Sequence, residues 1–305
     1  MTNDAPIYIL AGPTASGKTA LAILIARKQP VVIINADSKQ VYHEIPLITA
    51  QPSPEEQQQA PHTLYGHIPA SRHYSVANWL EDATNAITKA HTEDKIPFLV
   101  GGTGMYIKSL VYGMSNVPET LPQTRENVRK RWQASDTPTM HAHLSNIDPI
   151  AAEKLSPNDT QRVLRAIEVM EQTGKSIREW QKIRTIPPFK QAQYKMAFLD
   201  YPREEIYENC NKRFDAMMEN GVVDEIKAFD ALGLDETLPA MKAHGVPELR
   251  SYLNGTMTRA DAIEQATRNT RHYIKRQYTW FYHQMPEMVR CKTQEDAMQP
   301  FIQPP

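Results

Sequence analysis

The first third of the chain alternates short apolar runs with longer amphipathic segments. Three runs have the length and the β-branched or apolar content of buried strands: "IYIL" (7–10), "VVIIN" (31–35) and "IPFLV" (96–100). Two segments, "KTALAILIARKQ" (18–29) and "SVANWLEDATNAITKAH" (75–91), repeat apolar residues at helical spacing, the second with Ser75 as N-cap. Strands that alternate with helices predict an α/β fold with a parallel, doubly wound sheet, whose ligand site lies at the carboxyl ends of the strands. The proline-rich stretch "QPSPEEQQQAP" (51–61) is predicted to be a loop.

The pattern changes near residue 115, where helical spacing replaces the strand–helix alternation. In "SPNDTQRVLRAIEVMEQTG" (156–174), Asn158 or Asp159 is placed to cap a helix that Gly174 ends. We predict a helical insertion over 115–188 within a core formed by residues 1–114 and 189–305. In the core, "YKMAFLD" returns to a strand, a long helix ends at Gly221, and three further helical stretches follow.

The composition is that of a soluble globular protein. Of 305 residues, 41% are hydrophobic and 23% charged, and no apolar run approaches the roughly 20 residues that span a bilayer. The amino-terminal segment has no basic region of a secretory signal, and Cys210 and Cys291 lack the spacing of a disulfide framework or a zinc site. We therefore expect a cytoplasmic protein without a membrane segment; the sequence is silent on oligomeric state, and a monomer is the default expectation. The net charge of −1 excludes a uniformly basic nucleic-acid binder, but not one with its basic residues on one face.

The segment after the first predicted strand, "AGPTASGKT" (11–19), matches the phosphate-binding pattern G-x-x-x-x-G-K-[ST]. Its glycines let backbone N–H groups turn inward, the helix N-terminus adds partial positive charge, and the Thr19 hydroxyl is placed to hold a Mg²⁺ ion. The predicted phosphate-binding residues are Gly12, Pro13, Thr14, Ala15, Ser16, Gly17, Lys18 and Thr19. Kinases, NTPases and enzymes with a diphosphate leaving group all need such a loop, so the loop alone leaves the reaction open.

Three further residues carry chemistry if the sheet forms as predicted. Asp37 in "NADSKQVY" (35–42) is a carboxylate able to accept a proton or to hold the metal through water, or else a turn residue that bonds its own backbone. In "GGTG" (101–104), the glycines permit close backbone approach and Thr103 offers a hydroxyl, although a plain strand-to-helix turn fits equally. Arg213 reaches a phosphate if it lies at the edge of its helix, and is otherwise a solvated arginine.

Three basic segments indicate a nucleic-acid partner or, alternatively, solvated helix faces. Basic stripes with interleaved aromatic residues suit a phosphate backbone and unstacked bases, whereas ion pairs on a solvated helix explain any single stripe. Three stripes in a nearly neutral chain make the two interpretations about equal. Their residues are Arg125, Arg129, Lys130 and Arg131; Gln161, Arg162 and Arg165; and Arg268, Arg271, Lys275 and Arg276.

Together these motifs resemble those of bacterial tRNA dimethylallyltransferases, the IPP transferase family. The segments "GPTASGKT", "NADSKQVY", "GGTGMYIKSL", "SPNDTQRVLRAIEV", "KRFDAMMENG" and "TRHYIKRQYTWF" occur in the family's order and cover residues 7 to about 283. The resemblance implies a P-loop NTPase-like sheet with an inserted helical domain. It further implies transfer of the dimethylallyl group from dimethylallyl diphosphate to N6 of the adenosine 3′-adjacent to the anticodon in tRNA, with release of diphosphate and a requirement for Mg²⁺.

The same resemblance implies roles for the residues singled out above. Lys18, Thr19 with Mg²⁺, the loop amides and Arg213 would stabilise the charge that grows on the departing diphosphate. Asp37 would accept the proton as the amine attacks the allylic carbon, and Thr103 would contact the adenosine, which must leave the base stack to reach that carbon. The family's tRNA contacts match Asp37, Ser38, Lys39, Gln40, Thr103, Arg125, Gln161, Arg162 and Arg165.

Four positions depart from the family's usual pattern. His43 and Glu44 stand where many relatives have Arg-Gly, Gln51 replaces a lysine, and Met105 replaces a leucine. The first three changes reduce the positive charge expected beside the site.

Three other functions are compatible with the motifs. A P-loop kinase of a nucleoside or small metabolite would use Asp37 as a base toward a hydroxyl, but the chain has no obvious arginine-rich lid. An RNA-binding ATPase switch would need a metal-binding carboxylate after a buried strand, for which Asp200 is the other candidate. Prenyl transfer to free AMP would differ only in the acceptor.

Overall fold

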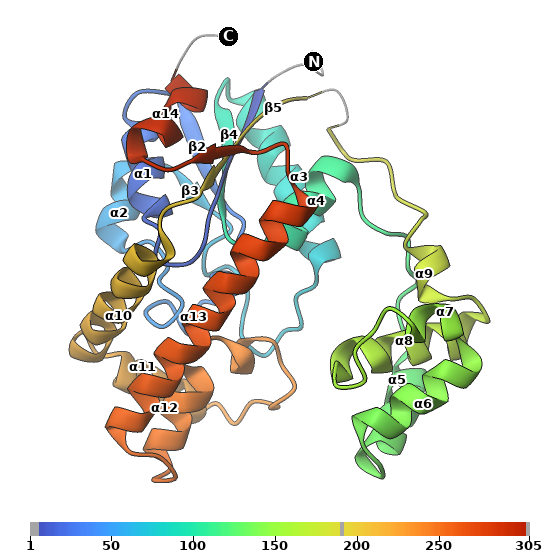
Figure 1. The fold of residues 1–305 in the computed structure, drawn as a ribbon. Coiled ribbons are helices and arrows are strands. Elements are labelled where there is room, and N and C mark those ends of the chain that lie inside the picture. The colour runs from blue at the N-terminus through green and yellow to red at the C-terminus, as the bar shows by residue number, and fades with distance from the viewer. Residues whose placement is uncertain (1–5, 190–191, 303–305) are drawn as a thin grey trace. The chain divides into compact units, whose positions relative to one another are not determined.

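The computed structural model of the chain describes residues 6–189 and 192–302. The chain divides into two compact units (Figure 1). The first unit comprises Met1–Val111 and Pro188–Pro305 and contains the sheet, and the second comprises Tyr112–Pro187 and is mainly helical.

A six-stranded parallel sheet with the order β3-β2-β4-β1-β5-β6 forms the centre of the first unit. The predicted α/β fold with a parallel, doubly wound sheet is therefore confirmed. The strands are β1 (Pro6–Ala11), β2 (Val31–Asn35), β3 (His62–Thr63), β4 (Ile96–Gly101), β5 (Gln193–Leu199) and β6 (Val289–Cys291).

The register of the strands brings several loops to one edge of the sheet. Ala11, the last residue of β1, lies opposite Gly101 of β4 and Phe198 of β5. Asn35, the last residue of β2, lies opposite Val100. Because the strands are parallel and end together, the segments that follow β1, β2, β4 and β5 all begin at this carboxyl edge.

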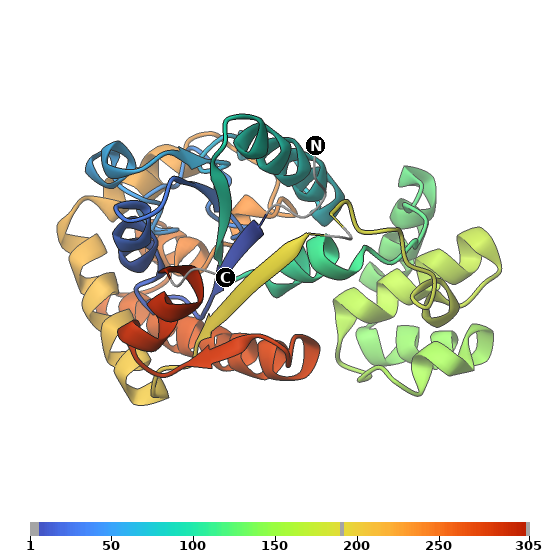
Figure 2. The same ribbon diagram turned by 90° about the horizontal axis from the view of Figure 1, so that it is seen from above.

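Helices cover both faces of the sheet (Figure 2). Tyr8 and Leu10 point to the face covered by α1 and α14, where they join one hydrophobic core. On the other face Phe198 contacts Tyr278 and Phe281 of α13, and α3 packs on β2 and β4. The helices outside the insertion are α1 (Lys18–Ala26), α2 (Pro54–Gln59), α3 (Val76–Thr92), α4 (Gly104–Tyr112), α10 (Arg203–Glu219), α11 (Val222–Asp230), the 3₁₀ helix η1 (Ala240–Lys242), α12 (Val246–Leu253), α13 (Arg259–Gln284) and α14 (Gln294–Ile302).

Local sequence signals explain most of the element boundaries. The Ser75 hydroxyl accepts the N–H of Asn78 at 3.2 Å, so the predicted N-cap of α3 is confirmed. The prediction of a loop over residues 51–61 is wrong, because Ser53 and Glu56 form a capping box that starts α2. The two- and three-residue strands β3 and β6 were not predicted, since such short strands carry no detectable periodicity.

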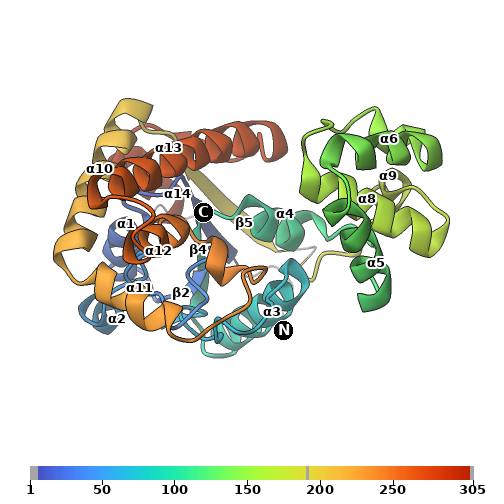
Figure 3. The same ribbon diagram turned by 90° about the horizontal axis from the view of Figure 1, so that it is seen from below.

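The second unit consists of short helices around its own core (Figure 3). The Asp159 carboxylate accepts the N–H of Arg162, and Gly174 ends the same helix with a φ of 66°, as predicted for both positions. Its helices are α5 (Pro122–Gln133), α6 (Thr137–Ile147), α7 (Pro149–Ala152), α8 (Thr160–Thr173) and α9 (Ile177–Trp180). Val128, Leu144, Val163 and Ile167 are fully buried between them.

No helix in the described ranges combines the length and the apolar character that a membrane crossing requires.

The close packing at the carboxyl edge predicts a large steric cost for a methyl group on Gly101. A Cβ at this position would lie 2.2 Å from the carbonyl carbon and oxygen of Ala36, so the backbone has to shift. We expect Gly101→Ala to lower the free energy of unfolding by about 1–3 kcal/mol or more, measured by urea denaturation. Gly233→Ala is the control, because its φ of 60° disfavours a side chain but its surroundings are open; it should cost only about 1–2 kcal/mol. A smaller loss for Gly101→Ala than for Gly233→Ala would contradict the steric argument.

Candidate active site

A cavity of about 500 Å³ opens at the carboxyl edge of the sheet in the first unit. The loop between β1 and α1 forms one wall, and segments after β2, β4 and β5 form the others. The lining residues are residues 14–20, Asp37, Gln40, residues 49–51, Glu56, Tyr65, Val100, Gly101, Tyr201, Glu205, Asn209 and Arg213. All the phosphate-binding candidates from Thr14 to Thr19 therefore face one cavity, together with Asp37 and Arg213.

The phosphate-binding loop is held in a wound conformation by its own side chains. The Ser16 hydroxyl donates to the Pro13 carbonyl at 2.8 Å, and Gly17 takes a φ of 76° that glycine tolerates. The Lys18 ammonium donates to the carbonyls of Gly12 and Pro13 at 3.0 and 2.7 Å. Burial of this ammonium lowers the pKa of Lys18 to about 8, an effect that the negative charge of Asp37 partly offsets. An anionic oxygen is a stronger partner for an ammonium than a carbonyl is, so the loop is electrostatically suited to phosphate.

Arg213 on α10 is directed at the phosphate-binding loop. Its Nη2 donates to the Thr14 hydroxyl at 2.6 Å, although 199 residues separate the two in the sequence. Burial lowers the pKa of Arg213, as expected for a guanidinium withdrawn from water. The interpretation of Arg213 as a solvated surface arginine is therefore wrong.

Asp37 forms the turn that its sequence position allowed, and its carboxylate also faces the cavity. Its Oδ1 accepts the N–H of Lys39 at 2.9 Å, which is the self-bonded turn typical of aspartate. The same carboxylate lines the cavity. Asn35, which is fully buried, fixes the turn by accepting the Asp37 N–H at 2.8 Å and by donating to the Asp37 carbonyl at 3.0 Å. The carboxylate is thus held in place by its backbone.

Thr103 connects the turn after β4 to the turn after β2. Its hydroxyl oxygen accepts the N–H of Ser38 at 2.9 Å and donates to the Ser38 hydroxyl at 3.3 Å. Tyr273 of α13 lies beside Thr103, and burial raises the pKa of this tyrosine above its ordinary value. Thr103 therefore lies between the backbone of the Asp37 turn and an aromatic ring of α13.

Gln277 on α13 is a site residue that sequence reasoning missed. Its Oε1 accepts the N–H of Thr14 at 3.0 Å, and its Nε2 donates to the Gly102 carbonyl at 2.9 Å. A Cβ on Gly102 would lie 2.2 Å from the Gln277 Nε2, so only glycine permits this contact. The sequence did carry a signal for this residue, because Gln277 is a lone glutamine on the apolar stripe of α13 that includes Ile274 and Phe281. A buried amide needs hydrogen-bond partners, so its presence on that stripe indicates a specific contact.

The segment 47–51 forms another wall and is held from two sides. Gln40 donates to the carbonyls of Thr49 and Ala50 at 3.0 and 2.6 Å. The carboxylate of Glu225 on α11 accepts the N–H groups of residues 47 and 48 at 2.7 and 2.9 Å. Gln51, at a position where the family resemblance led us to expect lysine, donates to the Tyr42 carbonyl at 2.7 Å, so it contributes a structural hydrogen bond.

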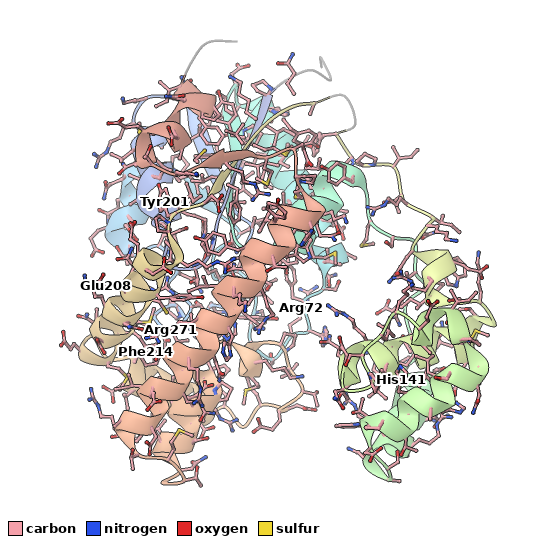
Figure 4. The ribbon with its side chains drawn as sticks, in the orientation of Figure 1. Arg72, His141, Tyr201, Glu208, Phe214 and Arg271 are labelled. Carbon is pink, nitrogen blue, oxygen red and sulfur yellow. The ribbon has the colours of Figure 1, made fainter. Side chains whose placement is uncertain are left out.

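A smaller cavity of about 50 Å³ adjoins the first and shares Thr14, Asp37, Thr49 and Arg213 with it. Its remaining wall is largely apolar. Phe214 on α10 is buried there, and Figure 4 labels it below Tyr201, which lines the large cavity. The residues that complete this wall are Lys39, Ile48, Cys210, Met217, Ala243, His244, Thr270 and Tyr273.

The basic residues predicted to contact nucleic acid differ in their exposure. Arg268, Lys275 and Arg276 of α13 are exposed, but Arg271 is half-buried and lies toward α10 (Figure 4). Its Nη2 donates to Asn211 at 2.8 Å, and its guanidinium lies 6.0 Å from the centroid of the Tyr207 ring. The alternative interpretation of the stripe as a solvated helix face therefore does not hold for Arg271.

Within the second unit, Arg125 and Gln161 are exposed, and Arg162 pairs with Asp159 at 2.9 Å. Arg165 is half-buried and donates to the Pro118 carbonyl at 2.8 Å and to the Thr120 hydroxyl. Within the described part of the chain, the side chains of Arg125 and Gln161 thus make no strong internal contact, whereas Arg165 supports its own unit.

The parallel sheet, the wound loop with its lysine and the cavity beside it define a P-loop α/β protein. A sequence model described as IPP transferase matches residues 40–284, and one described as isopentenyl transferase matches residues 5–65. The chain is 44% identical to the tRNA dimethylallyltransferases of Azorhizobium caulinodans and of Rhodopseudomonas palustris, over 92% of its own length and 90% and 88% of theirs. The chain belongs to the IPP transferase family. The predicted family and its enzyme class, a prenyltransferase, are confirmed, and the kinase alternative is not favoured.

Solved structures with the same fold cover nearly the whole chain. The tRNA isopentenylpyrophosphate transferase of Bacillus halodurans is 31% identical over 98% of this chain and 94% of its own, with a TM-score of 0.68. A eukaryotic dimethylallyltransferase acting on tRNA is 26% identical over 97% of this chain and 76% of its own, with a TM-score of 0.78.

The hydrogen bonds of Gln277 predict that this residue supports the phosphate-binding loop. We expect Gln277→Ala to lower the free energy of unfolding by about 1–3 kcal/mol, because the Thr14 N–H and the Gly102 carbonyl lose their partner. Binding of inorganic diphosphate, measured by calorimetry, should weaken as well. Gln284→Ala on the same helix is the control, since this exposed residue bonds only Lys108 of α4 in the described contacts; it should change stability by less than about 0.5 kcal/mol. Equal effects of the two variants would contradict a role of Gln277 in the loop.

Proposed function

We propose that this protein transfers the dimethylallyl group from dimethylallyl diphosphate to N6 of the adenosine 3′-adjacent to the anticodon in tRNA, with release of diphosphate. The observation that carries the proposal is the change of lining from the large cavity to the small one. A phosphate-binding loop lies beside Arg213 and Asp37, and an apolar wall formed by Ile48, Phe214 and Met217 follows directly. This sequence of walls suits a ligand with a diphosphate at one end and a short hydrocarbon at the other.

The cationic end of the site would stabilise the leaving group. Breaking the bond between the allylic carbon and oxygen leaves charge on the diphosphate, and donors fixed in advance lower the cost of that charge. In our proposal the loop N–H groups of residues 14–19, the Lys18 ammonium and the Arg213 guanidinium supply those donors. The Lys18 and Arg213 charges are partly withdrawn from water, which strengthens their attraction for an anion.

The donor set is suited to a Mg²⁺ ion bound mainly through the substrate. Magnesium commonly takes one or two protein ligands and completes its shell with substrate phosphates and water. Thr19 and Asp37 line the same cavity as the rest of the loop, so a hydroxyl and, through water, a carboxylate fit that pattern. Bound there, the ion would add positive charge beside the diphosphate oxygens. Among the described residues, no group of three His, Cys, Asp or Glu side chains is placed for a metal held by protein alone.

Asp37 and Thr103 would act on the acceptor. The exocyclic amine of adenosine is a weak nucleophile, so it has to be positioned against the allylic carbon and lose a proton as the carbon–nitrogen bond forms. Asp37, on the wall common to both cavities, would take that proton. Thr103, which is hydrogen-bonded to Ser38 and lies beside Tyr273, would orient the base, which has to leave its stack to reach a buried carbon.

The tRNA would be bound by both parts of the chain. We propose a catalytic core formed by residues 1–114 and 189–305, and a helical insertion over 115–188 that contacts tRNA. The contacts would come from the segment 37–40 and Thr103 in the core and from side chains on α5, α8 and α13. The candidate side chains are Arg125, Gln161, Arg162, Arg165, Arg268, Arg271, Lys275 and Arg276.

One experiment separates this proposal from the alternatives. The purified protein is incubated with an anticodon stem-loop, Mg²⁺ and labelled dimethylallyl diphosphate, and in parallel with labelled ATP, with AMP as the competing acceptor. We expect the label on N6 of the adenosine that is 3′-adjacent to the anticodon in the stem-loop. Transfer of phosphate from ATP to a small molecule, or alkylation of AMP in preference to the hairpin, would overturn the proposal.

Asp37 both accepts the Lys39 N–H in its turn and faces the cavity, and two substitutions separate its proposed role as a base from its role in the turn. Asp37→Asn keeps an acceptor for the Lys39 N–H but cannot take a proton, whereas Asp37→Ala loses both functions. We expect both variants to lower kcat by about two to four orders of magnitude with little change in tRNA affinity. Near-normal turnover in Asp37→Asn would show that only the turn matters.

The exposed residues of α13 should carry the salt dependence of tRNA binding. Lys275→Ala removes an exposed cation and should reduce the slope of log affinity against log salt by about 0.7–0.9 if the residue contacts a phosphate. Arg271→Ala should change the slope less, because its guanidinium is engaged with Asn211. Equal slopes in Lys275→Ala and the unaltered protein would assign this helix face to solvent.

A further inference from the structure

A buried tryptophan contacts both turns that carry the groups proposed to act on the acceptor. Trp79 on α3 is fully buried, and it is not among the described residues that line the large or the small cavity. Any contribution to the site therefore has to pass through its neighbours. Two of its contacts are specific: a hydrogen bond to the end of β2, and a ring stack with the start of α4.

The first contact reaches the turn of Asp37. The indole Nε1–H of Trp79 donates to the Asn35 carbonyl at 2.8 Å, and both residues are fully buried. Asn35 is the last residue of β2, and its side chain accepts the Asp37 N–H at 2.8 Å and donates to the Asp37 carbonyl at 3.0 Å. Because a buried carbonyl without a partner is costly, the indole fixes where β2 ends and where the Asp37 turn begins.

The second contact reaches the turn of Thr103. The ring of Trp79 is stacked on the ring of Tyr106, with centroids 4.4 Å apart and planes at 12° to each other. Tyr106 lies on the first turn of α4, and its N–H donates to the Thr103 carbonyl at 3.0 Å. Burial raises the pKa of Tyr106, and the charges of Tyr42 and Asp37 raise it further, so this residue also lies near the Asp37 carboxylate.

The two turns also hold each other, so a shift of one is passed to the other. The Thr103 N–H donates to the Ala36 carbonyl at 3.1 Å, and the Thr103 hydroxyl accepts the Ser38 N–H at 2.9 Å. Trp79 adds a contact from α3, where one rigid ring touches a neighbour of each turn. Side chains that are locked by packing and hydrogen bonds in this way hold reacting groups within about 0.5 Å of their productive geometry.

We propose that Trp79 is a positioning residue, which sets the separation of Asp37 and Thr103 for the attack of the adenosine amine on the allylic carbon. The inference rests on the proposed function and adds to it a residue that touches neither substrate. The indole acts through Asn35 on the Asp37 turn and through Tyr106 on the Thr103 turn.

The proposal makes a specific demand on the kinetics. In the transfer step the amine nitrogen bonds to the allylic carbon, the bond from that carbon to the diphosphate oxygen breaks, and Asp37 takes the proton of the amine. The diphosphate itself is held by the phosphate-binding loop and Arg213, which Trp79 does not contact in the described hydrogen bonds and ring contacts. Loss of the indole should therefore slow the transfer without weakening the binding of the diphosphate.

The test removes the indole N–H while an aromatic ring stays in place. Trp79→Phe keeps a ring for the stack on Tyr106, and the benzothienyl analogue of tryptophan at position 79 keeps the whole shape with sulfur in place of the N–H. We expect each change to lower kcat for prenyl transfer to the anticodon stem-loop by about tenfold to a hundredfold, the scale of a small displacement of reacting groups. The KM for dimethylallyl diphosphate, and the affinity for inorganic diphosphate in calorimetry, should stay unchanged.

A second substitution separates positioning from a general loss of stability. If the indole acts through Asp37, Trp79→Phe should lose most of its effect on kcat once Asp37→Ala is present, because residues that act as a unit are not additive. The slow transfer in these backgrounds is measured in single turnovers. A residue that only stabilises the fold would lower the transfer rate by the same factor with or without the Asp37 carboxylate.

Trp132→Phe is the control for the loss of an indole N–H. Trp132 is half-buried in the second unit, and its Nε1–H donates to the Thr137 hydroxyl at 3.1 Å. Its replacement should lower the free energy of unfolding, as that of Trp79 should, but it should leave kcat unchanged.

Three results would overturn the role of Trp79. The first is a normal kcat in both Trp79→Phe and the benzothienyl analogue, and the second is an undiminished effect of Trp79→Phe beside Asp37→Ala. The third is a loss of diphosphate affinity in step with kcat, which would assign the indole to the core as a whole. A failure of the unaltered protein to alkylate the stem-loop is a different result, because it overturns the proposed function and the role of Trp79 with it.

Discussion

The close approach of three backbone turns at the carboxyl edge of the sheet is the constraint on which the site depends. The turn after β4 touches the turn after β2 at Gly101 and the phosphate-binding loop at Gly102, where a side chain would collide with backbone or with Gln277. The side-chain amide of Gln277 then connects the phosphate-binding loop at Thr14 to the turn after β4 at Gly102. Because α13 supplies this bridge and also packs on Phe198 of β5, the position of the loop is tied to the core of the sheet.

The packing of these turns buries the ammonium groups of Lys18 and Lys39 near the carboxylate of Asp37. Lys18 and Lys39 both have a pKa lowered to about 8, mainly by burial, and Asp37 opposes the shift in each case. A lysine with a folded pKa below its unfolded value makes folding less favourable at neutral pH. This cost begins to fall as pH rises through about 8 and is gone above the ordinary lysine pKa of 10.5. An anionic ligand would compensate the same charges at neutral pH, so ligand binding and stability should be linked through these residues.

The chemistry of the site is set by the neighbours of the P-loop more than by the loop itself. A phosphate cradle is common to proteins with unrelated reactions, so the loop identifies an anion and no more. The apolar wall of Phe214 and Met217 beside Arg213 distinguishes this site from a simple nucleotide pocket. All three residues lie on α10, which is far from the P-loop in the sequence.

The sequence by itself determined the parallel sheet, the phosphate-binding loop, the caps of α3 and α8 and the family. Each of these is signalled by a pattern that can be read along the chain: the alternation of strands and helices, one contiguous loop motif, the capping residues, and the order of the motifs. It missed α2, since a capping box was hidden among prolines, and the short strands β3 and β6, whose length carries no period. Only the tertiary structure decided that Arg213 meets Thr14, that Arg271 is engaged with α10, and that Gln277 joins two loops. Those contacts link segments far apart in the sequence. A buried polar side chain needs hydrogen-bond partners, but its residue type does not reveal which distant group the partner will be.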